Sequence, residues 1–408
     1  MTADTLALVV AIDRGIGPDP LTLHRPKAAL PFGGKFRVID FTLANCLHSG
    51  MRRVLVLTQY KSHSLHKHLR DGWSIFNPEL GEFITAVPPQ MREGASWYAG
   101  ALDAIRQNRY LLKRSSARHI LVLDGGSVYR MDFAEMIRAH VERGADISLA
   151  LRSTESPGRS GPIVLMDEEE RVSEMSWAGD NEKNHTSDGA EQTGLTTMGV
   201  CLFDKKVLLA ELDCAEASAA ESRDLMDYLI PSLLTSRRVL GYRFGQERGR
   251  VTPDRYWCGL ESIDAYYDAN LALLRTDPPL DLYQEDWNIR TYQGQYPPAR
   301  TVPGSSGTEG IFVNSMLAAG TVILGGGVNH SILCPRVRVM DRAIVDSSIL
   351  CDNVCVGEGS HLRNCIVDKE VQIPPNMRIG FDRALDRQRF TVSPNGIVVV
   401  DKGFRFGG

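Results

Sequence analysis

Short apolar runs alternate with amphipathic helical patterns over about the first 150 residues. Continuous apolar runs occupy residues 6–11, 53–57, 119–123 and 147–151. Helical patterns lie between them, at residues 36–47, 101–113 and 132–142. An apolar run without polar alternation is typical of a strand that is buried on both faces. Alternation of such strands with helices predicts an α/β domain built on a mostly parallel, doubly wound sheet.

The alternation of strand and helix patterns ends after residue 153. Residues 153–194 are rich in Ser, Gly, Asp and Glu, which predicts hairpins and loops at the edge of the sheet. A strand pattern returns at 199–203, and residues 225–234 and 263–274 have helical patterns. Prolines then cluster and the periodicity is lost, so we expect residues 276–305 to form a linker between two domains.

Aliphatic residues recur every six positions in the C-terminal part of the chain. Three runs have this spacing: Ile311, Leu317 and Ile323; then Ile344, Leu350, Val356 and Leu362; then Val367, Ile373 and Ile379. A second register runs through Leu333, Val339, Val345 and Cys351. This period indicates a hexapeptide parallel β-helix, in which each short strand buries one aliphatic side chain. A β-sandwich, the alternative, would show strict alternation over longer segments. We expect the β-helix to occupy residues 306–408.

Length and charge limit the classes of function. At 408 residues the chain is too long for one compact core, so two domains are expected. The 46 basic and 50 acidic residues give a net charge of −4, which argues against nucleic acid or an anionic membrane as the main partner. No apolar run approaches the ~20 residues that span a bilayer, and the N-terminus has an acid where a signal peptide needs basic residues. We therefore expect a cytoplasmic protein.

The loop after the first strand carries candidate phosphate-binding groups. These are Arg14, Gly15, Gly17, Arg25, Lys27 and Lys35. A strand followed by a glycine-containing loop is where nucleotide-dependent α/β proteins place their ligand. Among the eight cysteines, Cys351 and Cys355 lie four apart, but no paired histidines complete a zinc site. We interpret the cysteines as small buried apolar residues.

Several long segments resemble bacterial ADP-glucose pyrophosphorylases. They include PFGGKFRVIDFTLANCLHSG (31–50), VLTQYKSHSLHKHL (56–69), SWYAGALDAI (96–105), DLYQEDWNIRTY (281–292) and LCPRVRV (333–339). The resemblance implies a Rossmann-like nucleotidyltransferase domain (1–275) and a left-handed parallel β-helix of hexapeptide repeats (306–408). It also implies synthesis of ADP-glucose and pyrophosphate from ATP and glucose 1-phosphate, for glycogen biosynthesis, in a tetramer with allosteric effectors.

The resemblance implies roles for individual residues as well. In the loop that should hold ATP, Arg14 is retained, and Lys27 matches a family lysine. Further matches to nucleotide- or sugar-binding positions are Gln59, Gln90, Tyr98, Gly100, Asp103, Asp224 and the pair Met198 and Gly199, with Thr197 in place of a serine. We interpret these residues as remnants of a substrate site.

Both aspartates that should bind Mg²⁺ are replaced, by Gly126 and Gly259. Asp124 and Glu261 lie two positions away, where an extended chain keeps a side chain on the same face but moves it by ~6.6 Å. Since Mg²⁺ is bound at about 2.1 Å, this offset requires a rebuilt site. Loss of both metal contacts would slow the reaction on the order of 10⁵-fold. We therefore predict no metal site, and Mg²⁺ only if the chain is active.

Other substrate contacts are also lost. The glycine pair of the first loop is Ile12 and Asp13, which would block close approach and repel phosphate. The second arginine of that loop is Gly17. Where the family uses a Glu-Lys pair for glucose 1-phosphate, this sequence has Trp177 and Ala178.

Positions that the family uses for phosphorylated effectors keep their basic character. They are His24, in place of a lysine, and Arg25, Arg37, Arg336 and Arg389. Arginine is suited to bidentate contacts with phosphate. Solvated surface charges or interdomain salt bridges are the alternative interpretation of these residues.

The leading hypothesis is a catalytically impaired homologue that serves as a regulatory or structural subunit. It would form a homotetramer, or a heterotetramer with an active subunit, and bind phosphorylated effectors. ATP and glucose 1-phosphate are further candidate ligands. One alternative is an active glucose-1-phosphate adenylyltransferase with a rebuilt metal site. Another is a sensor of sugar phosphates or nucleotides that binds them without turnover.

Overall fold

The structure, a computed structural model, divides into two compact units. It describes residues 1–12, 19–59, 61–90, 97–154, 161–177, 194–215, 224–245, 255–292 and 294–407. The first unit comprises Met1–Arg14, Phe41–Ser62 and His66–Gly259, and the second Gly15–Asp40, His63–Leu65 and Leu260–Gly408. The segment Gly15–Asp40 thus groups with the C-terminal part of the chain, although it precedes most of the first unit in sequence.

A nine-stranded, mostly parallel sheet forms the centre of the first unit. Its strands are β1 (Thr5–Ala11), β4 (Arg53–Thr58), β5 (Phe83–Val87), β6 (His119–Asp124), β8 (Ile147–Thr154), β9 (Ile163–Met166), β10 (Val172–Ser176), β11 (Gly194–Asp204) and β12 (Val239–Arg243). The order is β10-β9-β11-β6-β1-β4-β5, and β8 joins β11 to β12. Only β11 and the β9–β10 hairpin pair antiparallel with their neighbours. The predicted mostly parallel sheet, and the hairpin at its edge, are confirmed.

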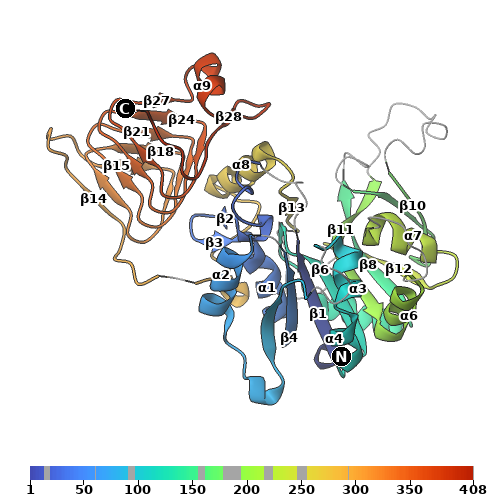
Figure 1. Cartoon of the computed structure of the whole chain (residues 1–408). Helices are drawn as coiled ribbons and strands as arrows, with labels where there is room; N and C mark the ends of the chain where they lie inside the picture. Colours follow the sequence, from blue (N-terminus) through green and yellow to red (C-terminus); the bar gives the residue numbers. More distant parts are fainter. Residues whose placement is uncertain are drawn as a thin grey trace, which may run out of the picture. The chain divides into compact units, whose positions relative to one another are not determined.

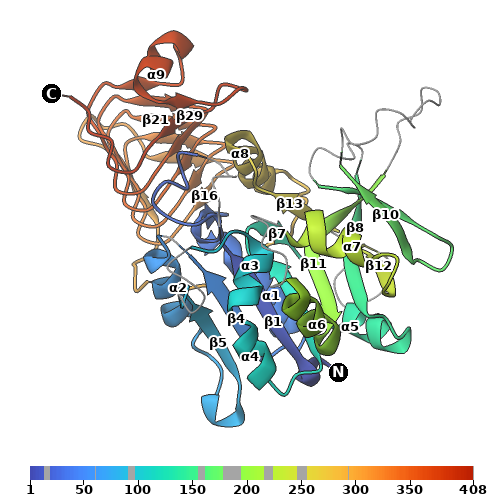
Figure 2. The same cartoon turned by 45° about the vertical axis from the view of Figure 1, so that its right-hand side comes forward.

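Both faces of this sheet are buried, as the continuous apolar runs predict. Leu6 and Leu8 of β1 pack into one core cluster with side chains of α3 (Ala101–Gln107), α4 (Arg109–Arg114) and α6 (Lys205–Ala215). These three helices lie together in front of the sheet in Figure 2. Ala7 and Val9, which alternate with those leucines, are also fully buried. A strand covered on both faces has no need for polar positions.

The remaining elements of this part of the chain are mostly short. They are the 3₁₀ turns Thr2–Asp4 and Pro78–Leu80, α1 (Val38–His48), α2 (His63–Trp73), β7 (Ser127–Tyr129), α5 (Phe133–Glu142), the π-helical turn η4 (Leu225–Leu229), α7 (Ile230–Leu233) and β13 (Trp257–Gly259). No helix in the described ranges is both long and apolar enough to cross a bilayer.

Two helix predictions were wrong in detail. The expected single helix over 101–113 is broken at Asn108, whose side-chain amide donates to the Tyr98 hydroxyl and to the carbonyl of Ala104, both at 2.8 Å. The helix expected from residue 36 begins at Val38. The two residues before it, β3 (Phe36–Arg37), pair instead with β2 (Pro31–Phe32) in a small hairpin.

The second unit contains a parallel β-helix with three sheets, drawn orange to red in Figure 1. The first sheet holds β14 (Arg300–Val302), β17 (Val322–Leu324), β20 (Arg338–Val339), β23 (Cys355–Val356) and β26 (Gln372–Ile373). The second holds β15 (Ile311–Val313), β18 (Gly327–Asn329), β21 (Ile344–Asp346), β24 (His361–Arg363) and β27 (Arg378–Ile379). The third holds β16 (Met316–Leu317), β19 (Ile332–Leu333), β22 (Ile349–Leu350), β25 (Cys365–Val367), β29 (Val398–Val400) and the antiparallel β28 (Thr391–Val392). The strand β14 lies within the range that we expected to be linker.

The corners of the β-helix explain why the six-residue period is not exact. One column of corner residues, with φ between 42° and 50°, is formed by Asn314, His330, Ser347 and Asn364. Most of the expected inward positions, among them Leu350, Val356 and Leu362, are fully buried. The prediction was wrong for Ile344, which is 44% exposed, because the coil faces inward at Val345, a residue of the second register. It was also wrong for Ile311, which is 56% exposed because every side chain of β15 is exposed.

Shorter elements complete the second unit. They are the 3₁₀ turn Lys27–Ala29, α8 (Ile263–Leu271), the 3₁₀ turns Ala272–Leu274 and Glu285–Trp287, and α9 (Arg383–Arg389). The Tyr266 hydroxyl of α8 donates to the carbonyl of Pro31 at 2.6 Å. The Tyr267 hydroxyl donates to the carbonyl of Ser347 at 2.5 Å. Helix α8 therefore connects the segment Gly15–Asp40 to the β-helix.

A pair of substitutions tests the inward positions of the β-helix. Leu350→Ala should lower the free energy of unfolding by about 2–5 kcal/mol, because it leaves a cavity in a closed coil. Ile344→Ala, at a position that shares the six-residue register with Leu350, should change it by less than about 0.5 kcal/mol, because the side chain is exposed. Urea unfolding of both variants measures the difference. Equal losses of unfolding free energy in the two variants would contradict the assignment of Leu350 as inward-facing and Ile344 as exposed.

Candidate functional site

Gly126 and Gly259, the positions where the resemblance predicts metal aspartates, lie close together: Gly126 directly precedes β7, and Gly259 ends the neighbouring strand β13. Strand β6 ends at Asp124, and the turn through Gly125 and Gly126 leads directly into β7. Strand β13 pairs antiparallel with β7, and this register sets Gly259 opposite Ser127. The two positions, separated by more than a hundred residues in sequence, therefore belong to one place in the fold. Neither has a side chain that could bind a metal.

Asp124, the nearest carboxylate, is already committed to hydrogen bonds. One oxygen accepts the backbone N–H of Gly126 at 3.0 Å, and the other accepts the Ser127 hydroxyl at 2.5 Å. Gly199, with φ of +73°, packs against it so closely that an added Cβ would lie 2.9 Å from the Asp124 Cβ. Glu261, the second candidate substitute, is exposed. In the described ranges, no three His, Cys, Asp or Glu side chains are arranged to hold a metal ion. These residues do not fit a magnesium site.

The carboxyl edge of the parallel strands still carries one orphaned polar group. Ile12 follows β1, Gln59 follows β4 and Asp124 ends β6, so the three lie at the same edge of the sheet. The side-chain oxygen of Gln59 is buried and has no hydrogen-bond partner within the part of the chain that is described. Ile12 packs against the apolar core instead of opening the edge to a phosphate. This edge is where open α/β sheets bind ligands.

Several predicted nucleotide-binding residues lie elsewhere or outside the described ranges. Arg14, Asp13, Gly17 and Ala178 are outside them. Lys27 begins the 3₁₀ turn Lys27–Ala29 and is half-buried. Gln90 is exposed, and its amide donates to the carbonyl of Pro88 at 2.9 Å.

Tyr98, Gly100 and Asp103 have structural partners at the start of α3. The Tyr98 hydroxyl accepts from Asn108, and burial raises the pKa of Tyr98. Asp103 accepts from the backbone N–H of Ala99 at 2.8 Å and from the side chains of Arg106 and Gln107. Gly100 is the residue before α3, in extended backbone. These contacts explain the three residues without a ligand, and their role in binding stays a prediction.

Thr197 and Asp224 lie near each other on β11 and η4. The Thr197 hydroxyl accepts from the backbone N–H of Gly199 at 3.0 Å and contacts the sulfur of Met226 at 3.8 Å. Asp224 accepts from the backbone N–H of Leu225 and begins η4. Burial, helped by Asp224, raises the pKa of the neighbouring Asp227, and a hydrogen bond to Trp177 opposes this. We did not predict Asp227, although its spacing from Asp224 could have suggested it.

Arg25 and Arg37, two of the predicted effector residues, lie in a buried ionic cluster of the second unit. The Arg25 side chain is 5% exposed, forms an ion pair with Asp368 and donates to the carbonyl of Leu21 at 3.0 Å. Burial lowers the pKa of Arg25, but Asp368, together with Cys351 and Tyr266, raises it, and the net shift is upward. Arg25 therefore forms a salt bridge, as in the alternative interpretation of the predicted effector residues.

Two further cations, Arg37 and Lys369, lie in the same cluster, beside the carboxylates of Asp40 and Asp352. Burial lowers the pKa of Arg37, and Asp352 and Asp40 only partly oppose this. Lys369, which we did not predict, pairs with Asp352 at 3.2 Å, and burial together with Arg37 lowers its pKa. Burial is the largest cause of both shifts, so the lowered pKa values of Arg37 and Lys369 reflect the cost of holding these cations away from water.

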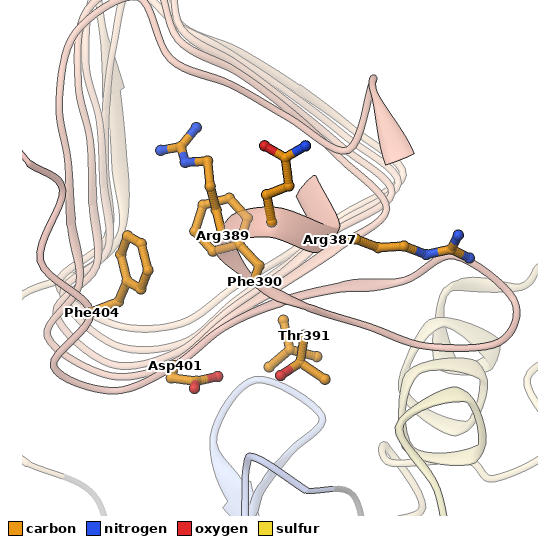
Figure 3. A pocket seen from close by; sticks show the side chains of 8 residues that line it. Arg387, Arg389, Phe390, Thr391, Asp401 and Phe404 are labelled. Atoms are coloured by element: carbon orange, nitrogen blue, oxygen red, sulfur yellow. The ribbon is translucent and has the colours of Figure 1, made fainter. Parts of the chain in front are cut away.

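A pocket of about 240 Å³ lies beside the C-terminal end of α9 (Figure 3). Its walls are Arg387, Gln388, Arg389, Phe390, Thr391, Val399, Asp401 and Phe404. The Arg389 guanidinium lies over the Phe390 ring, 4.8 Å from its centroid. Burial raises the pKa of Asp401, with a further upward contribution from Asp368 and a downward one from His24. His24, Asp401 and Asp368 therefore connect the pocket electrostatically to Arg25.

Arg336 differs from the other four predicted effector residues. It is exposed at a corner of the β-helix, with φ of +63°. Its guanidinium stacks on the Tyr296 ring at 5.2 Å from the centroid. His24, Arg25, Arg37 and Arg389 thus lie at or near one cluster and its pocket, whereas Arg336 has a separate aromatic partner. An effector-binding role for these five residues stays a prediction.

Comparison with known proteins agrees with both parts of the fold. Residues 19–276 match the family described as nucleotidyl transferase, and residues 297–400 match the GlmU-like C-terminal hexapeptide family. The chain is thus of the nucleotidyltransferase class that carries a hexapeptide-repeat domain, as its sheet and β-helix indicate.

Relatives that match over almost the whole chain narrow this class. The chain is 47% identical over 410 residues to glucose-1-phosphate adenylyltransferase 2 of Vibrio cholerae, covering 99% of each chain. It is 48% identical over 404 residues to the protein of the same name from Vibrio parahaemolyticus, covering 99% of this chain and all of the relative. Glucose-1-phosphate adenylyltransferase of Rhodopirellula baltica is 38% identical over 410 residues, 99% of this chain and 91% of the relative. The chain belongs to the glucose-1-phosphate adenylyltransferase family, and the resemblance found in the sequence is confirmed.

Proposed function

We propose that this chain is a catalytically impaired member of the family that binds phosphorylated effectors and acts as a regulatory or structural subunit in ADP-glucose synthesis. The observation that carries the proposal is the pairing of β7 with β13, which brings Gly126 and Gly259 together. Transfer of a nucleotidyl group needs the charge of the phosphates to be neutralised while the reacting oxygens are held in line. A site with glycine at both metal positions supplies no ligand for that task.

The state of Asp124 argues against the first alternative, an active enzyme with a rebuilt metal site. A carboxylate whose two oxygens accept from Gly126 and Ser127 would have to break both hydrogen bonds to bind Mg²⁺. Each broken bond to a charged acceptor costs about 1.5–3 kcal/mol. The second alternative, a sensor that binds without turnover, is favoured by the orphaned oxygen of Gln59, which can accept from a ligand at the carboxyl edge.

A pyrophosphate-release assay tests the catalytic part. With ATP, glucose 1-phosphate and Mg²⁺, the purified chain should turn over on the order of 10⁵-fold more slowly than a family enzyme with both aspartates. The double substitution Gly126→Asp and Gly259→Asp should raise the rate above that of either single variant, because the two carboxylates act on one metal. Turnover near that of the intact enzyme in the unaltered chain would refute catalytic impairment.

Effector binding by the ionic cluster is tested separately. Fructose 1,6-bisphosphate, as a probe with two phosphates, should bind in calorimetry, and Arg37→Gln should weaken it about tenfold through loss of one charge-assisted contact. Arg378→Gln is the matched control, because Arg378 is an exposed arginine of the same unit that lies over the Phe381 ring. Equal affinity in the Arg37 and Arg378 variants would show that the cluster does not bind the probe.

Assembly into a homotetramer or a mixed tetramer is the remaining part of the proposal. It is supported by β15, where the side chains of Ile311, Phe312 and Val313 are all about half-exposed at the end of a parallel sheet. An exposed apolar edge strand is a common site of association between chains. Sedimentation of the chain, alone and mixed with an intact family member, should give a complex larger than the monomer. A monomer under both conditions would contradict this part.

A further inference from the structure

One face of the β-helix carries an exposed apolar column. It is the outer face of the sheet β15-β18-β21-β24-β27 (Figure 1). In β21 and β24 the middle residues, Val345 and Leu362, are fully buried, so the first and third residues of each strand point outward. The parallel register places the first residues in one column, which runs Ile311, Gly327, Ile344, His361 and Arg378. The two isoleucines of this column are both about half-exposed.

Gly327 makes a notch in the column. A Cβ added to Gly327 would have no neighbour within 4 Å, so the space above this glycine is open. Ile311 and Ile344 lie one strand away on either side of it. Since neighbouring strands are about 4.8 Å apart, the two isoleucines leave room between them for one aliphatic side chain. The notch therefore has the size of a side chain such as Ile344 itself.

A second column on the same face is mostly polar. It runs Val313, Asn329, Asp346 and Arg363. The Asn329 amide donates to the Asp346 carboxylate at 2.9 Å, and the Arg363 guanidinium lies 3.6 Å from the same carboxylate. A carboxylate can accept about four hydrogen bonds, and an amide has a second N–H and an oxygen. Asn329 and Asp346 thus have capacity for further hydrogen bonds, and Arg363 compensates the charge of Asp346.

We propose that this face pairs with the same face of a second copy of the chain, about a two-fold axis that is parallel to the strands and lies between β18 and β21. Such an axis reverses the order of the strands and keeps each column opposite itself. Ile344 then fills the notch at the partner's Gly327, and Asn329 faces the partner's Asp346. Each contact occurs twice, as a two-fold interface requires.

The other possible two-fold axis fits the side chains less well. An axis along the β-helix would keep the order of the strands and exchange the two columns. It would set Ile344 against the partner's Asp346, and it would leave both Gly327 notches unfilled. Burying a carboxylate against an aliphatic side chain is unfavourable. The two columns therefore select the axis parallel to the strands.

The inference rests on the proposed assembly and specifies one of its interfaces. Five strands spaced by about 4.8 Å make a face on the order of 20 Å long, which is small beside a standard interface of about 800 Å² per partner. A tetramer with dihedral symmetry has more than one kind of two-fold interface, so a small face can act together with another contact. The exposed end strand β15 is the candidate for that other contact.

Disulfide trapping between two differently tagged full-length chains tests the pairing. One chain carries Gly327→Cys and the other Ile344→Cys, because the two cysteines would link within one chain if they were combined. With diamide as the oxidant, the mixed dimer should form at least tenfold faster than in the control mixture of Gly327→Cys with Arg300→Cys. Arg300 is exposed on β14, in another sheet of the same β-helix. The native cysteines that are not buried are first replaced by serine: Cys214, Cys258 and Cys355.

Sedimentation of a charge variant gives a second measurement. Ile344→Lys should weaken self-association at least tenfold, because it sets a charge against the partner's notch. Gln372→Lys, at an exposed position of β26 in another sheet, is the matched control and should leave self-association unchanged.

The inference is overturned if the 327–344 mixture links no faster than the control mixture, or if the two lysine variants associate alike. In either case a chain that still assembles would retain the proposed role as a subunit. A chain that remains a monomer, alone and with an intact family member, would overturn both the inference and the proposed assembly.

Discussion

A folded chain can bury an ionisable group only if that group is paired, hydrogen-bonded or neutral, and this constraint governs the functional regions of the protein. Asp124 meets it with Gly126 and Ser127, and Asp368 meets it with Arg25. His140 meets it by remaining neutral. Arg37 and Lys369 are buried beside Asp352, and burial lowers the pKa of both. A buried group whose hydrogen bonds and charge are already matched within the protein has little remaining capacity to bind a ligand. A buried group that lacks such partners is a place where a ligand would stabilise the fold.

The same constraint explains why the carboxyl edge and the ionic cluster differ. At the edge, positions 126 and 259 carry no carboxylate, and the Asp124 carboxylate accepts hydrogen bonds from Gly126 and Ser127. In the second unit positively charged side chains are present, and Arg25 and Lys369 form ion pairs with Asp368 and Asp352. A cation site and an anion site in one family are thus separable, because each depends on its own balance of buried charge. The proposed regulatory role follows from that separation.

Much of the fold followed from local pattern. The apolar runs located the buried strands of the sheet, since a strand covered on both faces needs no polar positions. The six-residue period predicted the β-helix, because each strand of a narrow coil buries one side chain. The first register failed at Ile344, which is 44% exposed, whereas Val345 of the second register faces inward. The helix over 101–113 was overestimated because the Tyr98–Asn108 hydrogen bond that breaks it depends on tertiary packing.

For the candidate site, the sequence by itself determined which chemical groups exist: glycine at positions 126 and 259, and arginine at 25, 37 and 389. Only the tertiary structure decided how those groups are used. In the folded chain, Gly259 lies opposite Ser127, and Arg25 forms an ion pair with Asp368. Lys369 joins the same cluster, and Arg336 stacks on the Tyr296 ring. The reason is physical. The identity of a side chain fixes its charge and its donors and acceptors, but the cost of burying it, and hence its freedom to bind a ligand, depends on partners that are distant in sequence.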